Sequence, residues 1–303
     1  MPHVAAYALL VALAGPPNET SVPAGTIKKD PASTGSTDLG GSGQFAASGT
    51  KPAEETDATE LNLSFGGIFN TGNARSIAVT GLGKFLIRRK IHQFTAAAAG
   101  NYGRAAVAAF DDEATDGIDE SKVNLTVGNA QGQVRYDVFF HPNFSAFLMT
   151  TARHDRFQGL DLRLNVDPGI AMYALTNEKH KMWFEVGYDF QFDLRRDDAL
   201  DAAEAADPGN RPSKTLINHA ARLFAGYTNN LNEHVSFDTG FEYLQSFLVA
   251  KRFRFNWISA LNVTLAERLA LAATFTLRYE NLPLPRVVKL DTITSLLLTV
   301  KII

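Results

Sequence analysis

The chain has 303 residues, of which 45% are hydrophobic, so it is long enough to bury a large core. Its 29 basic and 32 acidic residues leave a net charge of −3, which gives no support to a nucleic-acid partner. The chain contains no cysteine, which excludes disulfides and thiolate metal sites.

The first residues, MPHVAAYALLVALAG, contain an apolar run from Val4 to Ala14 that ends in the small-x-small pattern Ala12-Leu13-Ala14. A short apolar run before small residues is typical of a secretory signal, although the usual basic residues are missing in front of it. The run is too short to span a membrane as a helix, which takes about 20 residues. We therefore expect residues 1–14 to be a signal peptide; a buried or disordered N-terminal segment is the alternative.

Residues 15–58 are rich in Pro, Gly, Ser, Thr and Ala and contain almost no large apolar residue. Such a composition buries too little apolar surface to offset the entropy of ordering, so we predict a disordered linker. The remaining residues, 59–303, have little helical periodicity and form the predicted folded domain.

About twelve segments of alternating apolar and polar residues follow the linker, as expected for β-strands with one apolar and one polar face. In chain order they are residues 60–70, 76–87, 92–107, 122–139, 144–156, 160–172, 182–194, 214–227, 235–243, 253–265, 269–279 and 290–303. In residues 182–194, MWFEVGYDFQFDL, every large apolar residue except Trp183 falls on one parity. Within residues 122–139 the apolar parity switches, which predicts a bulge near Gly128 to Gly132.

The connections between these segments differ in length. Five are short and polar, at residues 88–92, 141–143, 177–180, 230–234 and 265–268, whereas residues 110–120 and 195–213 form long ones. Short periplasmic turns at one end, long loops at the other and an even strand count are the pattern of an outer-membrane β-barrel. The fold class that we predict is all-β, an antiparallel transmembrane β-barrel of about twelve strands in the cell outer membrane.

A soluble β-sandwich is the alternative, but the polar parity of the strands is unusually rich in charges of both signs. A barrel with an apolar exterior and a narrow charged lumen accommodates such charges, because they can pair across strands or be hydrated. The predicted lumen-lining residues are Arg135, Asp137, Arg153, Asp155, Asp161, Arg163, Asp167, Glu185, Asp189, Asp193, Arg222, Asp238, Glu242, Arg252, Arg254 and Arg278.

Three stretches resemble a known family. They are NLSFGGIFNTGNARS at 62–76, VRYDVFFHPNFSAFLMTTARHDRFQGLDLRLNVDPGIAMY at 134–173, and ERLALAATFTLRYENLPLP at 267–285. Together they are similar to the DUF481 family, which includes a salt-induced outer-membrane protein of enteric bacteria. The resemblance covers about residues 60–303 and implies an outer-membrane barrel of poorly defined function, without catalytic residues to carry over.

The sequence offers no catalytic, cofactor or metal site of a known pattern, since it lacks a Gly-rich phosphate loop, a metal-ligand pair and a nucleophile elbow. Four histidines fall in the predicted turns: His92, His141, His180 and His234. They could form a pH-sensitive rim, but we favour the simpler interpretation that they are polar turn residues at the membrane interface. If the protein were an enzyme, His154 and Asp155 would be the one adjacent His–Asp pair available for catalysis. The six acids of residues 111–120 miss the calcium-loop template and favour a solvated loop over a loose cation site.

Arg153, Asp155, Asp161 and Arg163 share the inward parity of two consecutive strands, so we expect them near one mouth of the barrel. Two roles are open for these residues: an ion-pair network that stabilises the hairpin, or a constriction that selects solutes by charge. We favour the ion-pair network, because opposite charges largely cancel the electric field that charge selectivity needs.

The leading functional hypothesis is a narrow or plugged pore for small solutes or ions, linked by the family resemblance to salt or osmotic stress. The second is a non-conducting structural barrel that acts through its extracellular loops, and a lipid-active enzyme is a distant third. The expected partners are outer-membrane lipid or lipopolysaccharide and, during biogenesis, the barrel-assembly machinery. No cofactor and no nucleic acid are expected, and the sequence leaves the oligomeric state open.

Overall fold

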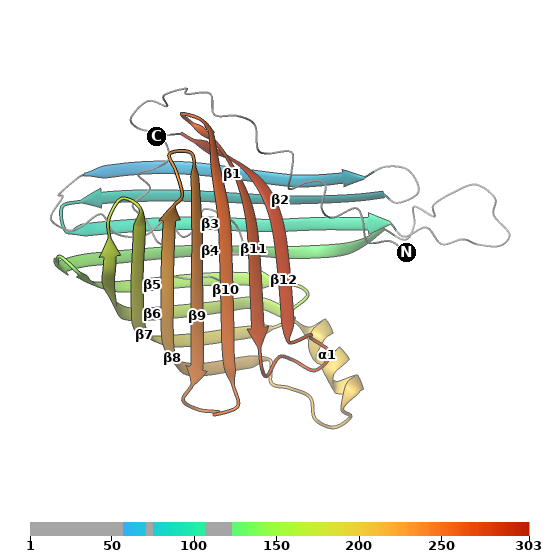
Figure 1. Ribbon diagram of the computed structural model, residues 1–303. Coiled ribbons are helices and arrows are strands. Elements are labelled where there is room, and N and C mark those ends of the chain that lie inside the picture. Colours follow the sequence, from blue (N-terminus) through green and yellow to red (C-terminus); the bar gives the residue numbers. More distant parts are fainter. Residues whose placement is uncertain (1–56, 71–74, 107–122, 303) are drawn as a thin grey trace, which may run out of the picture.

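The structure, a computed structural model, describes residues 57–70, 75–106 and 123–302 (Figure 1). Twelve strands and one helix follow the chain: β1 (Ala58–Asn70), β2 (Arg75–Arg89), β3 (His92–Ala106), β4 (Val123–His141), β5 (Phe144–Asp155), β6 (Leu160–Thr176), β7 (His180–Arg195), α1 (Asp197–Ala206), β8 (Thr215–Asn230), β9 (Val235–Ser246), β10 (Phe253–Ala266), β11 (Leu269–Glu280) and β12 (Leu290–Lys301). Each of the twelve predicted segments overlaps one of these strands. The predicted signal peptide, and the linker apart from Asp57 and Ala58, lie outside the described residues.

The strands form one closed antiparallel barrel in which each strand pairs with its neighbours in the chain, and β1 pairs with β12. This confirms the predicted all-β, antiparallel barrel of about twelve strands. The closing seam is short. Whereas β1 pairs with β2 along its whole length, β1 and β12 are in register only from Asn62↔Lys301 to Phe65↔Leu298. In Figure 1, β1 to β4 lie sideways across the view, whereas β12 rises from the bottom of the view to this seam near the C-terminus.

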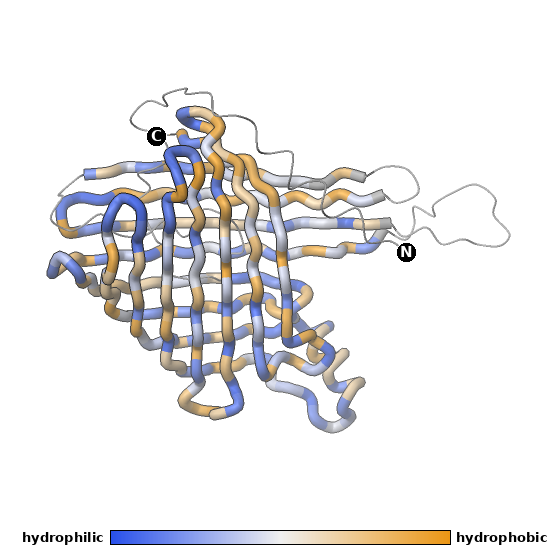
Figure 2. The backbone as a smooth tube through the Cα atoms, in the orientation of Figure 1, coloured by the Kyte–Doolittle hydropathy of each residue, from blue (hydrophilic) through white to orange (hydrophobic). Residues whose placement is uncertain are grey.

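The alternating polar and apolar residues of each strand point to the inside and the outside of the barrel, respectively. In β7, Trp183, Glu185, Asp189 and Asp193 are buried, whereas Val186 between them is 62% exposed. Exposed large apolar side chains recur on the outward parity of most strands, and the bands of opposite hydropathy along each strand are visible in Figure 2. Soluble monomers rarely expose so continuous an apolar surface, so the exterior is that of a membrane barrel.

The two ends of the barrel differ. At one end, which we call the turn end, the strand pairs β2–β3, β4–β5, β6–β7, β8–β9 and β10–β11 are joined by at most four residues. At the other, the loop end, the β7–β8 connection carries α1, which stands beside the barrel in Figure 1. In the described part of the chain, no helix is long and apolar enough to cross a membrane.

The predicted bulge in β4 is present but displaced. The register against β3 shifts between Gly103↔Val127 and Arg104↔Leu125, so the extra residue is Thr126 and not one of residues 128–132. A second shift lies at the start of β6, where Leu160 pairs with Arg195 and Leu162 with Leu194. The second bulge changes which residue of β6 faces the lumen.

Candidate functional site: the barrel lumen

The centre of the lumen, which we call the waist, is crossed by a chain of ion pairs. Arg135 of β4 donates hydrogen bonds to Asp137 on its own strand (2.7 Å) and to Glu185 of β7 (2.8 Å). Arg222 of β8 donates to the other oxygen of Glu185 (3.0 Å) and to Glu242 of β9 (2.7 Å). Because β4 and β7 are not neighbours in the barrel, the Arg135–Glu185 bond spans the interior.

The waist is closed in this conformation. The side chains of Arg135, Glu185 and Arg222 are 0% exposed, so water reaches them from neither mouth. The Arg135 guanidinium also lies 4.0 Å from the centre of the Phe147 ring, a cation–π contact that fixes its plane. Breaking one partner of such a network leaves an uncompensated buried charge, which costs about 3–5 kcal/mol.

A mainly aromatic cluster begins at the level of the waist, where Met149 pairs with Arg135 and Phe224 with Glu185, and extends toward the turn end. It consists of Phe139, Phe147, Met149, Ala171, Tyr173, Trp183, Phe224 and Ile258. Trp183 packs on Phe224, with ring centroids 5.9 Å apart, and Phe139 lies 5.8 Å from Tyr173. Apolar packing thus adjoins the ion pairs and continues the closure of the lumen toward the turn end.

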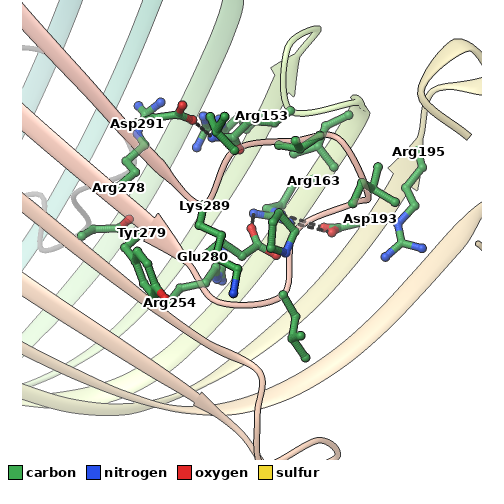
Figure 3. A pocket seen from close by; sticks show the side chains of 18 residues that line it. Arg153, Arg163, Asp193, Arg195, Arg254, Arg278, Tyr279, Glu280, Lys289 and Asp291 are labelled. Atoms are coloured by element: carbon green, nitrogen blue, oxygen red, sulfur yellow. Dashed lines mark hydrogen bonds and ion pairs between the residues drawn. The ribbon is translucent and has the colours of Figure 1, made fainter. Parts of the chain in front are cut away.

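On the loop side, the lumen contains a small cavity of about 40 Å³, which we call the vestibule. Figure 3 shows its lining, in which Arg163 lies between Asp193 (2.8 Å) and Glu280 (3.3 Å). Six basic and three acidic residues line it: Arg153, Arg163, Arg195, Arg254, Arg278, Lys289, Asp193, Glu280 and Asp291. Arg153 and Arg254 pair with Asp155 and Asp189, which lie outside this lining, so the positive excess that remains is small, and it favours anions at this mouth.

The described structure brings fourteen of the sixteen predicted lumen residues together as buried side chains within the barrel. They are Arg135, Asp137, Arg153, Asp155, Arg163, Asp167, Glu185, Asp189, Asp193, Arg222, Asp238, Glu242, Arg254 and Arg278. Arg252 is only partly buried and precedes β10, in the loop-end connection.

Asp161 is a correction to the predicted inward set. The bulge at the start of β6 turns its side chain to the rim, where it is 38% exposed and pairs with Arg196 (3.3 Å) and Lys214 (3.7 Å). The predicted four-residue cluster is therefore split. Arg153 pairs with Asp155 (2.6 Å), whereas Arg163 pairs with acids from β7 and β11.

The rim beside α1 carries its own ion pairs. Arg196 donates two hydrogen bonds to Asp198, at 3.0 and 2.8 Å, and these bonds hold the pKa of the Asp198 carboxyl below its usual value. The same bonds raise the pKa of Arg196. Both residues precede or begin α1, so the pair fixes the start of the helix in the β7–β8 connection.

The other predicted candidates lie apart. His154 faces outward and its ring contacts the Asp161 carbonyl, whereas Asp155 is buried inside, so the two do not form a catalytic pair. At the turn end, His92 contacts the Tyr136 hydroxyl (2.7 Å) and His180 that of Tyr227 (2.9 Å), in separate hairpins. Within the described residues, no group of three His, Asp or Glu side chains could hold a metal ion. The acidic residues 111–120 lie outside the described residues.

Comparison with known protein families identifies the family of this chain. Residues 63–302 match the family described as "Protein of unknown function, DUF481". The chain belongs to the DUF481 family. The match confirms the resemblance seen in the sequence. Among curated proteins, none matches this chain.

Three solved structures of outer-membrane proteins are similar to this DUF481 member at low sequence identity. A NanC porin structure is 10% identical, covers 80% of this chain and 98% of its own, with a TM-score of 0.45. An outer-membrane channel from Pseudomonas putida F1 is 12% identical, covers 84% and 100%, with a TM-score of 0.41. The outer-membrane channel DcaP of Acinetobacter baumannii is 9% identical, covers 81% and 95%, with a TM-score of 0.32.

Sequence reasoning missed the aromatic cluster of this DUF481 protein. It left Trp183 as an exception to the apolar parity of residues 182–194, whereas its side chain is 1% exposed inside the barrel. The alternation along the strands could have indicated the inward position of these aromatic residues. Trp183 lies on the same face of its strand as Glu185, and Phe139 on the same face as Arg135 and Asp137. An aromatic residue that occurs among the polar residues of one strand face is thus predicted to point into the lumen.

Proposed function

We propose that this DUF481 protein is an outer-membrane barrel whose lumen is a narrow pore for small solutes or ions, closed at the waist in the conformation described. The observation that carries the proposal is the Arg135–Glu185–Arg222 network across the lumen. Apolar side chains of similar volume would close a barrel with equal or greater stability. A charged network at this point instead supports a constriction that opens by rearranging its pairs.

Conductance in a planar lipid bilayer tests the proposal. The double variant Glu185→Ala/Arg222→Ala removes one charge of each sign and leaves Arg135 paired with Asp137. We expect wild-type protein to conduct rarely and the double variant to conduct more often, because removing Arg222 also removes the cation that packs on the Phe147 and Phe224 rings of the adjoining apolar cluster. The matched control is Glu204→Ala/Arg211→Ala, an exposed pair (2.8 Å) in the β7–β8 connection, which should behave as wild type.

Correct folding of each variant is checked by its heat-modifiable mobility in gel electrophoresis. A folded double variant that stays silent would contradict the pore and favour the second candidate, a non-conducting barrel that acts through its loops. The ion-paired α1 connection is the observation that favours this candidate. Opposite orientation of His154 and Asp155 disfavours the lipid-active enzyme.

The association with salt or osmotic stress is part of the proposal and rests on the family resemblance. Growth of a strain that lacks the gene tests it, in media of raised NaCl and of raised sucrose. A defect in both media supports a role in osmotic stress, a defect in NaCl alone supports a role for ions, and unimpaired growth contradicts the association.

A further inference from the structure

The outward wall of β2 to β5 contains a hollow at the level where a membrane barrel normally presents large apolar side chains. Two rows of small residues cross these strands in register, Gly81, Gly100 and Ala130 in one and Gly83, Ala98, Gly132 and Ala152 in the other. We call this surface the small-residue groove. Its central hollow measures about 600 Å³ and shares residues with hollows of about 440 and 570 Å³ on either side.

Neither the backbone nor the packing of the barrel requires these residues to be small. A Cβ added to Gly81 or Gly132 would meet nothing within 4 Å. Among the described glycines, positive φ values occur at Gly159 and Gly209, outside the groove. Glycine inside a strand also costs stability relative to residues with a side chain. The space outside the wall is therefore what the small residues provide.

The borders of the groove differ along its length. Large apolar side chains bound it on the β1 side and toward the turn end, including Leu63, Phe65, Phe85 and Val134. At its loop end the lining contains Arg156, Arg196 and His154, and among the residues that the structure describes no carboxylate lines any of the three hollows. Arg196 is paired with Asp198, whereas Arg156 is an exposed side chain beside the groove.

We propose that the small-residue groove binds a phosphorylated lipid with several acyl chains, the class to which the lipid anchor of lipopolysaccharide belongs. The acyl chains lie on the small residues, where they replace the missing apolar side chains. The phosphate lies at the loop end, where the Arg156 guanidinium donates charge-assisted hydrogen bonds to its oxygens. The site requires the barrel to lie in a membrane, but it is independent of whether the lumen conducts.

Native mass spectrometry of the full-length protein in detergent tests the groove, with a bisphosphorylated, hexa-acylated glucosamine disaccharide as the probe. The variant Gly81→Leu/Gly132→Leu fills the groove, and we expect the apparent dissociation constant to rise at least tenfold. The control Ala225→Leu/Ala273→Leu adds the same side chains to outward positions of β8 and β11 and should bind as wild type. Equal binding by the filled variant would overturn the proposal.

The phosphate contact has a separate readout. Arg156→Ala should weaken binding of the bisphosphorylated probe and leave binding of the dephosphorylated probe unchanged, because only the former offers anionic oxygens. A lipid site that ignores the phosphate would show equal losses and refute the assignment. If filling the groove instead converts a dimer into a monomer without changing lipid binding, the groove is an interface between copies and the proposal fails. Conductance of the same variants separates this outcome from the fate of the proposed pore.

Discussion

At the scale of single residues, the interior of the barrel depends on small residues that make room for large ones. A Cβ on Gly226 of β8 would lie 2.1 Å from the Trp183 ring, so this glycine creates the space that the indole occupies. We predict that Gly226→Ala displaces Trp183 and destabilises the barrel by about 1–3 kcal/mol, the usual cost of overpacking. Urea unfolding in detergent micelles, followed by tryptophan fluorescence, measures the change.

The matched control for that substitution is Gly132→Ala, which adds the same methyl group to the outside of the wall, where a Cβ meets nothing within 4 Å. Its unfolding midpoint should equal or exceed that of wild type, since alanine restricts the unfolded chain more than glycine does. Equal losses in the two variants would show that the strands themselves, and not the packing of Trp183, require glycine.

The stability of α1 is expected to depend on pH through the Asp198 carboxyl at the rim of the barrel. Its folded-state pKa is lowered by the Arg196 hydrogen bonds, so the pair stabilises the start of α1 at neutral pH. That contribution begins to weaken as the pH falls below the ordinary aspartate value of about 3.9 and is lost below the lowered pKa. The protection of α1 against hydrogen exchange, measured relative to the intrinsic rate at each pH, should therefore be constant from pH 8 to 5 and fall, relative to that of the strands, only in stronger acid.

The variant Asp198→Asn isolates the cause of that transition. It removes the titrating group, so the protection of α1 should already be reduced at neutral pH and should lose its acid transition. A transition that persists in this variant would assign it to another acid of the connection, such as Asp197, which pairs with Lys214 at 2.8 Å.

At the scale of elements, the seam between β1 and β12 is the weakest closure of the barrel. Four residue pairs join these strands, and the edge of β12 from Leu290 to Leu297 pairs with β11 alone in the described structure. We predict that amides of β1 and β12 exchange before those of β6 and β7, which pair along most of their length. Equal protection across the barrel would mean that the seam is closed by a partner.

A targeted variant checks the same seam. A Cβ on Gly66 would lie 2.5 Å from the Leu296 carbonyl oxygen, so Gly66→Ala forces the two strands apart. Exchange should accelerate in β1 and β12 and remain unchanged in β7. The variant Gly67→Ala is the neighbouring control, because its nearest contact, the Ala78 carbonyl oxygen at 3.2 Å, lies on β2.

At the scale of the whole molecule, the alternation of apolar and polar residues was sufficient to predict twelve strands and a charged interior. The period of two assigns every residue to a face as long as the register is regular. It failed where a bulge inserted an extra residue, which moved Asp161 to the rim, and where an aromatic residue stood on the polar parity, as Trp183 does. Contacts across the lumen, such as Arg135–Glu185, join strands that are not neighbours, and one sequence contains no signal for them.

The charge of the loop-end mouth gives a prediction for the molecule as a conductor. With six basic and three acidic residues, the vestibule should make the waist-opened variant Glu185→Ala/Arg222→Ala prefer anions. The preference should be strongest at low salt, because the Debye length falls from about 30 Å at 0.01 M to about 3 Å at 1 M. The reversal potential under a KCl gradient measures it. Adding Arg195→Ala/Lys289→Ala should shift that potential toward cations, whereas Arg211→Ala, outside the vestibule, should not. An unchanged reversal potential after the vestibule substitutions would mean that selectivity is set at the waist, by the charges that remain there.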